Sequence, residues 1–545
     1  MKAPIEFIDM NREDLDQLLE RARASLSETD FRKVKGMADA LSYLTDLVAD
    51  RETTIRDLRE LLSPASNEKT KPVLGKAGIQ GTKPGEGKAN THPTPGSSDS
   101  GANGEQKPKP RGHGRNGAQE YGNSPRVEVS HATLKSGDHC PGCLKGKVYQ
   151  QQEPRRLVRV VGQAPLTATV YELQRLRCNL CGEIYSPNPP EGVGEDKYDE
   201  TAAAMIALLK YGTGTPFYRL KNLEQNLGIP LPASTQWEIV EEAAEPIKPA
   251  RDELIRQAAQ GEVLHNDDTS MKVLALGREI AEEGGERTGI FTSGVVSTAA
   301  GRKIALFFTG RQHAGENLAD VLKRRAAELP MPIQMSDALS RNAPKPVEVL
   351  VGHCLVHGRR NFVKIVPNFP QACQHVLEEL GEVYYQDRLA REQGLSPAER
   401  LYHHQQFSKP VMDGLHQWME TQLTEKTVEP NSGLGRAINY MLRHWRPLTL
   451  FLREPGAPLD NNLVERSLKK AILHRKNSLF YKTVHGAEVG DLYMTLIYTC
   501  ELNHVNPFDY LTELLRHVEE LAANAADWMP WTYRATLERS SSTPH

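Results

Sequence analysis

Three acidic residues, far apart along the chain, stand in settings from which they could meet at one site. Asp267 lies in the strand-like run LHNDDTSMKVL, Asp337 ends a second apolar run, PIQMSD, and Glu465 opens a basic helical stretch, LVERSLKKAILHRKN. Three converging carboxylates bind hard divalent cations such as Mg2+, which prefer oxygen ligands and keep positions open for phosphate and water. The residues therefore predict phosphoryl transfer on nucleic acid.

Neighbouring acids compete for two of these positions. Asp268 directly follows Asp267, and because side chains alternate along a strand, only one of the two can point into a shared site. Asp320 is a weaker alternative to Asp337, since it falls inside a predicted helix. Asp460 precedes the helix of Glu465 and is interpreted as a helix cap.

Four of the seven cysteines form two CxxC pairs, Cys140–Cys143 and Cys178–Cys181, with 34 residues of strand-like sequence between them. Two such turns can close a tetrahedral site of four thiolates, which leaves no open position for water. The pattern predicts a structural Zn2+ ion in a small zinc ribbon. His353, Cys354 and His357 lack a fourth ligand at suitable spacing, so no second zinc site is predicted there.

The elements around the three acids follow an order that could bring them together. From residue 261 the pattern predicts three strands in EVLHNDDTSMKVLAL, TGIFTSGVVST and KIALFFTG, then a helix, another strand, a long helical stretch at about 372–450, and a helix beginning near Asp460. This is the order of an RNase H-like fold with a helical insertion. In that fold, acids at the centre of the first strand, the end of the fourth and a late helix converge.

The rest of the chain is divided by changes in composition. Residues 1–63 are predicted to be helical. A seam with alternating three- and four-residue steps predicts a coiled coil, which favours self-association over packing of this segment on its own domain; the seam is formed by Met37, Leu41, Leu44, Val48, Arg51, Ile55, Leu58 and Leu62. Residues 64–126 form a predicted flexible basic linker, with ten Lys or Arg against four Asp or Glu between Lys69 and Arg126. We therefore expect a multidomain α/β protein: coiled coil 1–63, linker 64–126, zinc ribbon 127–190, helical DNA-binding or positioning region 191–260, catalytic domain 261–500 and helical tail 501–545.

Composition sets outer limits on location and partners. The formal net charge of -3 and the pI near 6.7 do not by themselves indicate a nucleic-acid binder, so any DNA contact must depend on local basic clusters. The first twenty residues include Glu6, Asp9, Glu13 and Asp14 and lack the pattern of a signal peptide, and no apolar run is long enough to span a bilayer. We expect a cytoplasmic protein, associated with the nucleoid when bound to DNA, and no membrane partner.

Several motifs together resemble the IS66 family of bacterial insertion-sequence transposases. The strongest is LDNNLVERSLKKAILHRKNSLF; LHNDDT, GHCLVHGRRNF, the two CxxC pairs and DWMPWTYR support it. The resemblance implies that Asp267, Asp337 and Glu465 form a DDE triad holding two Mg2+ (or Mn2+) ions, about 4 Å apart in such sites. The chain departs from the family where Asp268 replaces the common Glu, and where Ala338-Leu339-Ser340 replaces a common Gly-Tyr after the second acid.

The resemblance implies a polynucleotide transferase that cuts at the ends of an insertion sequence and joins them to target DNA. Basic residues near the acids are candidate phosphate contacts: Arg466, Lys469, Lys470, Arg475 and Lys476, with Arg359 and Arg360. Element ends, target DNA, further copies of the chain and accessory proteins of the same element are the candidate partners. Two alternatives remain, an RNase H-like nuclease that only hydrolyses DNA and a non-catalytic zinc-ribbon DNA-binding regulator.

Overall fold

The computed structural model describes residues 126–541, except 130, 151–162, 178, 180, 182–183, 195 and 284–286, and a few single residues between 21 and 35. The predicted coiled-coil seam and the predicted linker up to residue 125 lie outside the described residues. The described residues fall into two compact units: one includes residues 335–338 and 351–461, and the other includes residues 339–350 and 462–541 together with the described residues from 126 to 334. No helix of the described part is long and apolar enough to cross a membrane.

Five strands form one mixed sheet in the order β5–β4–β3–β6–β7, which confirms the predicted α/β class. The strands are β3 (Val263–Ser270), β4 (Phe291–Ala299), β5 (Arg302–Gly310), β6 (Ile333–Ser336) and β7 (Leu350–His353). β3 pairs antiparallel with β4, and β4 pairs antiparallel with β5. β6 begins beside the start of β3, where the Ile333 N–H donates to the Glu262 carbonyl at 2.9 Å, so these two strands run parallel.

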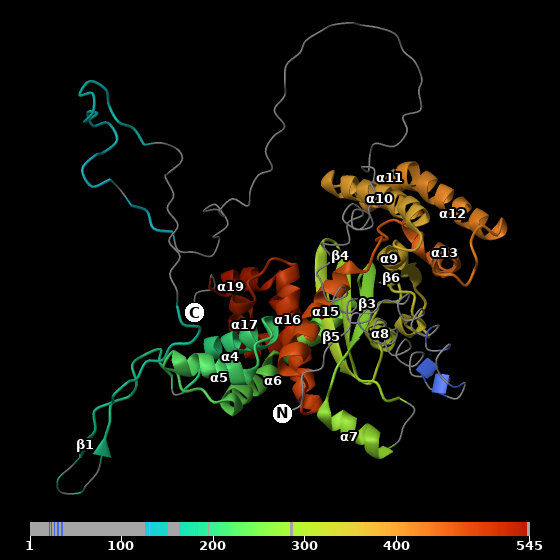
Figure 1. The fold of residues 1–545 in the computed structure, drawn as a ribbon. Helices are drawn as coiled ribbons and strands as arrows, with labels where there is room; N and C mark the ends of the chain where they lie inside the picture. The colour runs from blue at the N-terminus through green and yellow to red at the C-terminus, as the bar shows by residue number, and fades with distance from the viewer. Residues whose placement is uncertain are drawn as a thin grey trace. The chain divides into compact units, whose positions relative to one another are not determined.

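Helices of the second unit cover this sheet and extend beyond it (Figure 1). They are α4 (Glu200–Ala207), the π-helix η3 (Leu208–Gly212), α5 (Phe217–Asn226), α6 (Ala233–Ala258), α7 (Leu274–Glu283), α8 (Ala314–Leu322), the 3-10 turn η4 (Ser340–Asn342), α15 (Asn462–Ser478), α16 (Val484–Leu502), α17 (Pro507–Arg516), α18 (Val518–Ala523), η7 (Ala525–Trp528) and α19 (Tyr533–Ser541). A continuous apolar core joins α6 and α16 to the strands. A short hairpin, β1 (Leu176–Arg177) with β2 (Ile184–Tyr185), precedes them.

The open edge of the sheet at β5 is closed by side chains of α16. Residues four apart on α16 and at its C-cap accept hydrogen bonds from alternate N–H groups of β5 at 2.6–3.2 Å: Asp491 from Thr309, Thr495 from Phe307, Thr499 from Ala305 and the C-cap residue Asn503 from Lys303. The spacing works because side chains four apart share one helix face, while alternate residues of a strand share one edge. An unpaired strand edge is thereby protected from pairing with another chain.

The first unit is almost entirely helical in its described part. It contains α9 (Leu355–Ile365), α10 (Pro370–Glu392), α11 (Pro397–His403), the π-helix η5 (His404–Ser408), α12 (Lys409–Thr424), α13 (Gly433–Arg443), α14 (Trp445–Leu448) and η6 (Leu450–Leu452). One buried carboxylate, Asp387, ties several of these helices together. It accepts from Arg400 at 2.6 Å, pairs with Arg391 at 2.8 Å, and contacts the buried His404 ring at 3.3 Å.

Candidate active site

Adjacent acids on β3 face opposite sides of the sheet. Asp267 pairs across the ladder with Gly294, and Asp268 pairs with Ser293. A Cβ atom on Gly294 would lie 3.0 Å from Leu468 and 3.1 Å from Val464, both on α15. Directly paired residues share a face of the sheet, so Asp267 lies on the face that α15 covers.

Asp268 lies on the other face, against α8. Its carboxylate hydrogen-bonds to the His313 ring at 2.9 Å and forms an ion pair with the Arg341 guanidinium at 3.3 Å, and its side chain is only 2% exposed. The His313 ring packs 4.3 Å from the ring of Phe291, which also lies beneath Arg341. A buried carboxylate needs partners of this kind, since an unpaired buried charge is strongly unfavourable.

The turn η4 reaches both acids. The side-chain amide of Asn342 lies 3.5 Å from Asp267 Oδ1, while the preceding residue, Arg341, contacts Asp268. The backbone carbonyl of Asn342 accepts from Asn266 at 2.8 Å and from Gln334 at 2.7 Å, and the two amides also bond to each other at 2.8 Å. Sequence reasoning missed this network, although buried amides such as Asn266 and Gln334 inside apolar strand runs were a signal for it.

Glu465 occupies the first turn of α15. The adjacent Val464 is fully buried, Leu468 is nearly so, and α15 packs against β3 and β4. A carboxylate in the first helical turn is favoured by the positive end of the helix dipole. Asp267 and Glu465 thus belong to the same unit, and Asp267 faces the helix on which Glu465 lies.

Asp337 directly follows β6 and belongs to the first unit. Its carboxylate acts electrostatically on His353 and Tyr440. Burial lowers the pKa of His353 to about 4, with a further lowering by His444 and an opposing rise from Asp337. Burial raises the pKa of Tyr440 to about 12. The imidazole of His353 is therefore neutral at pH 7.

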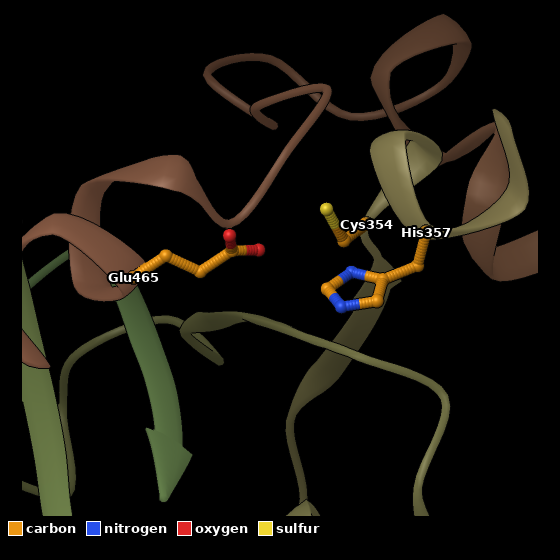
Figure 2. A group of neighbouring side chains, drawn as sticks. All are labelled: Cys354, His357 and Glu465. Atoms are coloured by element: carbon orange, nitrogen blue, oxygen red, sulfur yellow. The ribbon is translucent and has the colours of Figure 1, made fainter. Parts of the chain in front are cut away.

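Cys354 and His357 stand one helical turn apart at the start of α9. The Cys354 sulfur and a ring nitrogen of His357 lie within 4.8 Å of each other, and Cys354 is fully buried. The Asn461 N–H donates to the sulfur at 3.2 Å. Figure 2 shows these two side chains, together with the Glu465 carboxylate that extends from the first turn of α15. Sulfur and imidazole are ligands for softer divalent metals such as zinc.

The first CxxC pair adopts a tight turn suited to metal binding. The Cys140 N–H donates to the Gly146 carbonyl and the Leu144 N–H to the Cys140 carbonyl, each at 2.8 Å. Hydrogen bonds from the Gly146 and Lys145 backbone lower the pKa of the Cys143 thiol, which favours the thiolate that zinc requires. In the second pair, Cys181 lies in the turn between β1 and β2, and Cys178 lies outside the described residues. Among the described cysteines, Cys181 does not form a group with Cys140 and Cys143.

The basic residues predicted to contact phosphates fall into two groups: some are exposed, and the others are buried or already bonded to other parts of the protein. Arg466, Lys469 and Lys476 are exposed on α15. Lys470 donates to the Gly212 carbonyl at 3.0 Å and pairs with Glu501 at 2.8 Å, and Arg475 donates to Thr269 at 3.1 Å and to Ser270. Arg359 is buried and Arg360 is half-buried. Lys470 and Arg475 therefore already hold α15 against the rest of the unit.

Sequence similarity to known proteins includes the region of the chain that carries the candidate acids. Three uncharacterized proteins of Sinorhizobium fredii are similar to it: y4hP is 26% identical over 66% of this chain and 67% of its own length, and y4jD is 27% identical over 66% and 71%. The third, y4qI, is 25% identical over 62% of each chain. No solved structure matches. The model of the Transposase IS66 family matches residues 197–489, more than half of the chain, which spans β3, β6 and α15. The chain therefore belongs to the IS66 family of transposases.

Proposed function

We propose that this protein is a DNA transposase that cuts DNA at the ends of an insertion sequence and joins the freed ends to target DNA. The observation that carries the proposal is the placement of Asp267 on the face of β3 that α15 covers, with Glu465 in the first turn of that helix. Membership of a transposase family supplies the reaction class.

The strand order supports an RNase H-like catalytic domain. The third, second, first, fourth and fifth strands of the sheet lie side by side in that order, and the first three are antiparallel. Gln334, within β6, bonds to Asn266, the neighbour of Asp267 on β3. Asp337 is three residues beyond Gln334 on the same chain, at the end of this parallel strand. We infer that Asp337 joins Asp267 and Glu465 as the third acid of the site.

The donor set fits magnesium or manganese. Three carboxylates supply only oxygen atoms, which is the ligand type that Mg2+ prefers. Bound there, a pair of such ions would supply activation of the attacking oxygen and stabilisation of the leaving oxygen in an in-line displacement. Asp267 is the better first ligand than Asp268, because His313 and Arg341 already engage the Asp268 carboxylate on the other face.

The chain's own residues hold the acids and the DNA in place. Arg475 fixes the C-terminal half of α15 to the end of β3 through Thr269 and Ser270, and so constrains the helix that carries Glu465. Three exposed cations on the same helix, Arg466, Lys469 and Lys476, are proposed to contact DNA phosphates.

Zinc binding and self-association complete the proposal. We infer that Cys140, Cys143, Cys178 and Cys181 hold one structural zinc ion, which the bonded turn at the first pair supports. We also infer that the predicted coiled coil of residues 1–63 pairs copies of the chain, since transposition must bring two DNA ends together. Accessory proteins of the same element remain candidate partners.

A strand-joining assay tests the function. Purified protein with Mg2+ and a duplex carrying the terminal repeat of the element should yield cleaved ends and products joined to a target duplex. Asp267→Asn, Asp337→Asn and Glu465→Gln should each abolish both products while preserving the folded state measured by circular dichroism. Asp320→Asn is the matched control, because this acid is exposed on α8 and pairs with Lys323. Cleavage without joining would assign a nuclease instead, and specific DNA binding without cleavage would assign a regulator.

A further inference from the structure

The 3-10 turn η4 follows β6 and contacts the two adjacent acids in the middle of β3, which lie on opposite faces of the sheet. Arg341 contacts Asp268 on the α8 side, and Asn342 contacts Asp267 on the α15 side. Two consecutive residues of the turn thus contact two consecutive carboxylates. Asp268 is held by His313 and Arg341, whereas Asp267 is approached by the neutral amide of Asn342. This division distinguishes the two acids chemically.

The turn is anchored by bonds that do not depend on the Asn342 side chain. The backbone carbonyl of Asn342 accepts from the Asn266 amide at 2.8 Å and from the Gln334 amide at 2.7 Å. Asn266 and Asn342 are fully buried and Gln334 is 1% exposed. Buried hydrogen bonds of this kind specify one arrangement, because leaving any member without a partner is strongly unfavourable. A change confined to the Asn342 side chain keeps this anchor.

The Asn342 amide and one backbone N–H reach the same oxygen of Asp267. Asp267 Oδ1 accepts from the Asp268 N–H at 2.8 Å and lies 3.5 Å from Asn342 Nδ2. Two donors directed at one carboxylate oxygen restrict the rotation of the group about its side-chain bonds. Hydrogen bonds at catalytic sites are often long before the substrate complex forms and shorten within it.

We propose that Asn342 is a positioning residue, which orients the Asp267 carboxylate for binding Mg2+ or Mn2+. The inference rests on the proposed function, because it takes Asp267 as a metal ligand. Groups that hydrogen-bond to a ligating carboxylate tune the metal, and their loss lowers metal affinity about 10- to 100-fold. Asn342 acts through Asp267, and the predicted effect is therefore on metal affinity.

Direct metal binding is the first test. The dissociation constant for Mn2+, measured by electron paramagnetic resonance of the free ion, should rise about 10- to 100-fold in Asn342→Ala. Asn342→Leu keeps the side-chain volume but removes the donor, and it should show the same shift if the alanine variant fails to fold. Asn317→Ala is the matched control, because Asn317 is also a buried amide but donates to Ser293 on the α8 face, at 2.9 Å.

Activity provides a second, separable readout. The Mg2+ concentration for half-maximal cleavage should rise in Asn342→Leu by the same factor as the Mn2+ constant. Wild-type Mn2+ affinity in a folded Asn342→Leu, alongside loss of a bound ion in Asp267→Asn, would overturn the inference and leave the proposed function standing. Unchanged Mn2+ binding in Asp267→Asn would overturn both.

Discussion

Replacing Gly294 by alanine tests whether the close approach of α15 to β4 sets the geometry of the two acids. The added Cβ would meet Leu468 Cδ2 at 3.0 Å, Leu468 Cγ at 3.1 Å and Val464 Cγ2 at 3.1 Å. These distances are too short for ordinary carbon contacts, which are optimal at about 3.5–4.0 Å. The helix or its side chains must therefore move by a few tenths of an ångström.

Two opposing contributions determine the effect on stability. Overpacking of a filled core costs about 1–3 kcal/mol. Removing a glycine from a strand recovers about 0.5–1 kcal/mol, because the unfolded chain loses conformational freedom. Overpacking outweighs this gain, so we expect Gly294→Ala to lower the free energy of unfolding by about 1–2 kcal/mol in urea denaturation.

The effect on activity should exceed the effect on stability. Glu465 follows Val464 directly, so a shift of this turn moves the carboxylate relative to Asp267. Misplacement of a reacting group by about 1 Å costs roughly 100-fold in rate, so a shift of a few tenths of an ångström should cost several-fold to about tenfold. The cleavage rate of the strand-joining assay, measured at a temperature where the variant is fully folded, gives this number.

A second substitution tests whether crowding against Leu468 causes the effects of Gly294→Ala. Leu468→Ala removes the nearest atoms and by itself should cost about 2–5 kcal/mol. The double variant should lose at least 1 kcal/mol less free energy of unfolding than the sum of the losses in Gly294→Ala and Leu468→Ala. The reason is that the new methyl group fills part of the space left by the Leu468 side chain. Gly310→Ala, whose Cβ would meet nothing within 4 Å, should match the wild type in rate. Strictly additive costs, or full activity in Gly294→Ala, would refute the reasoning.

Three further predictions concern buried and metal-binding groups. Burial raises the pKa of Asp491 to about 6 from 3.8, so the folded state binds a proton at this carboxyl group more tightly than the unfolded chain does. The free energy of unfolding should therefore fall as pH rises from about 4 to 6. Asp491→Asn should remove that fall, measured by urea denaturation at each pH. Burial lowers the pKa of Lys210 to about 8 from 10.5, so between these pH values the unfolded chain binds more protons than the folded state. The free energy of unfolding should therefore rise as pH increases from about 8 to 10.5, and Lys210→Met should remove that rise. Cys140→Ser should lose one zinc per chain by elemental analysis, whereas a zinc-free wild-type protein would contradict the ribbon.

The sequence predicted the order of strands and helices because each pattern is local. Three strands, a helix, a fourth strand and a late helix at Glu465 all occur in the predicted order. One boundary was wrong, since the strand that begins at Val263 was expected to continue through KVLAL, whereas β3 ends at Ser270 and α7 begins at Leu274. The cause is distant in sequence: the Tyr481 N–H donates to the Lys272 carbonyl at 2.8 Å, and the Leu274 N–H donates to the Tyr481 carbonyl at 2.9 Å.

The choice between Asp267 and Asp268 shows what a single sequence cannot supply. Alternation establishes that the two acids face opposite sides, but it does not tell which side is covered by α15. That information comes from the register of β3 with β4 and from the contact of Gly294 with a helix about 170 residues later. The same limit applies to Lys470 and Arg475, whose partners come from other parts of the chain.

Contacts along the whole of α15 explain why its position is well determined. Near its start, Val464 and Leu468 pack over Gly294; further along, Lys470 bonds to η3. In its last two turns, Arg475 bonds to the end of β3, and Ser478 accepts from Lys210 at 2.8 Å. A helix held at four levels cannot slide or rotate without breaking several buried or half-buried contacts at once. The relation between Asp267 and Glu465 is therefore built into the folded unit before any metal or DNA binds.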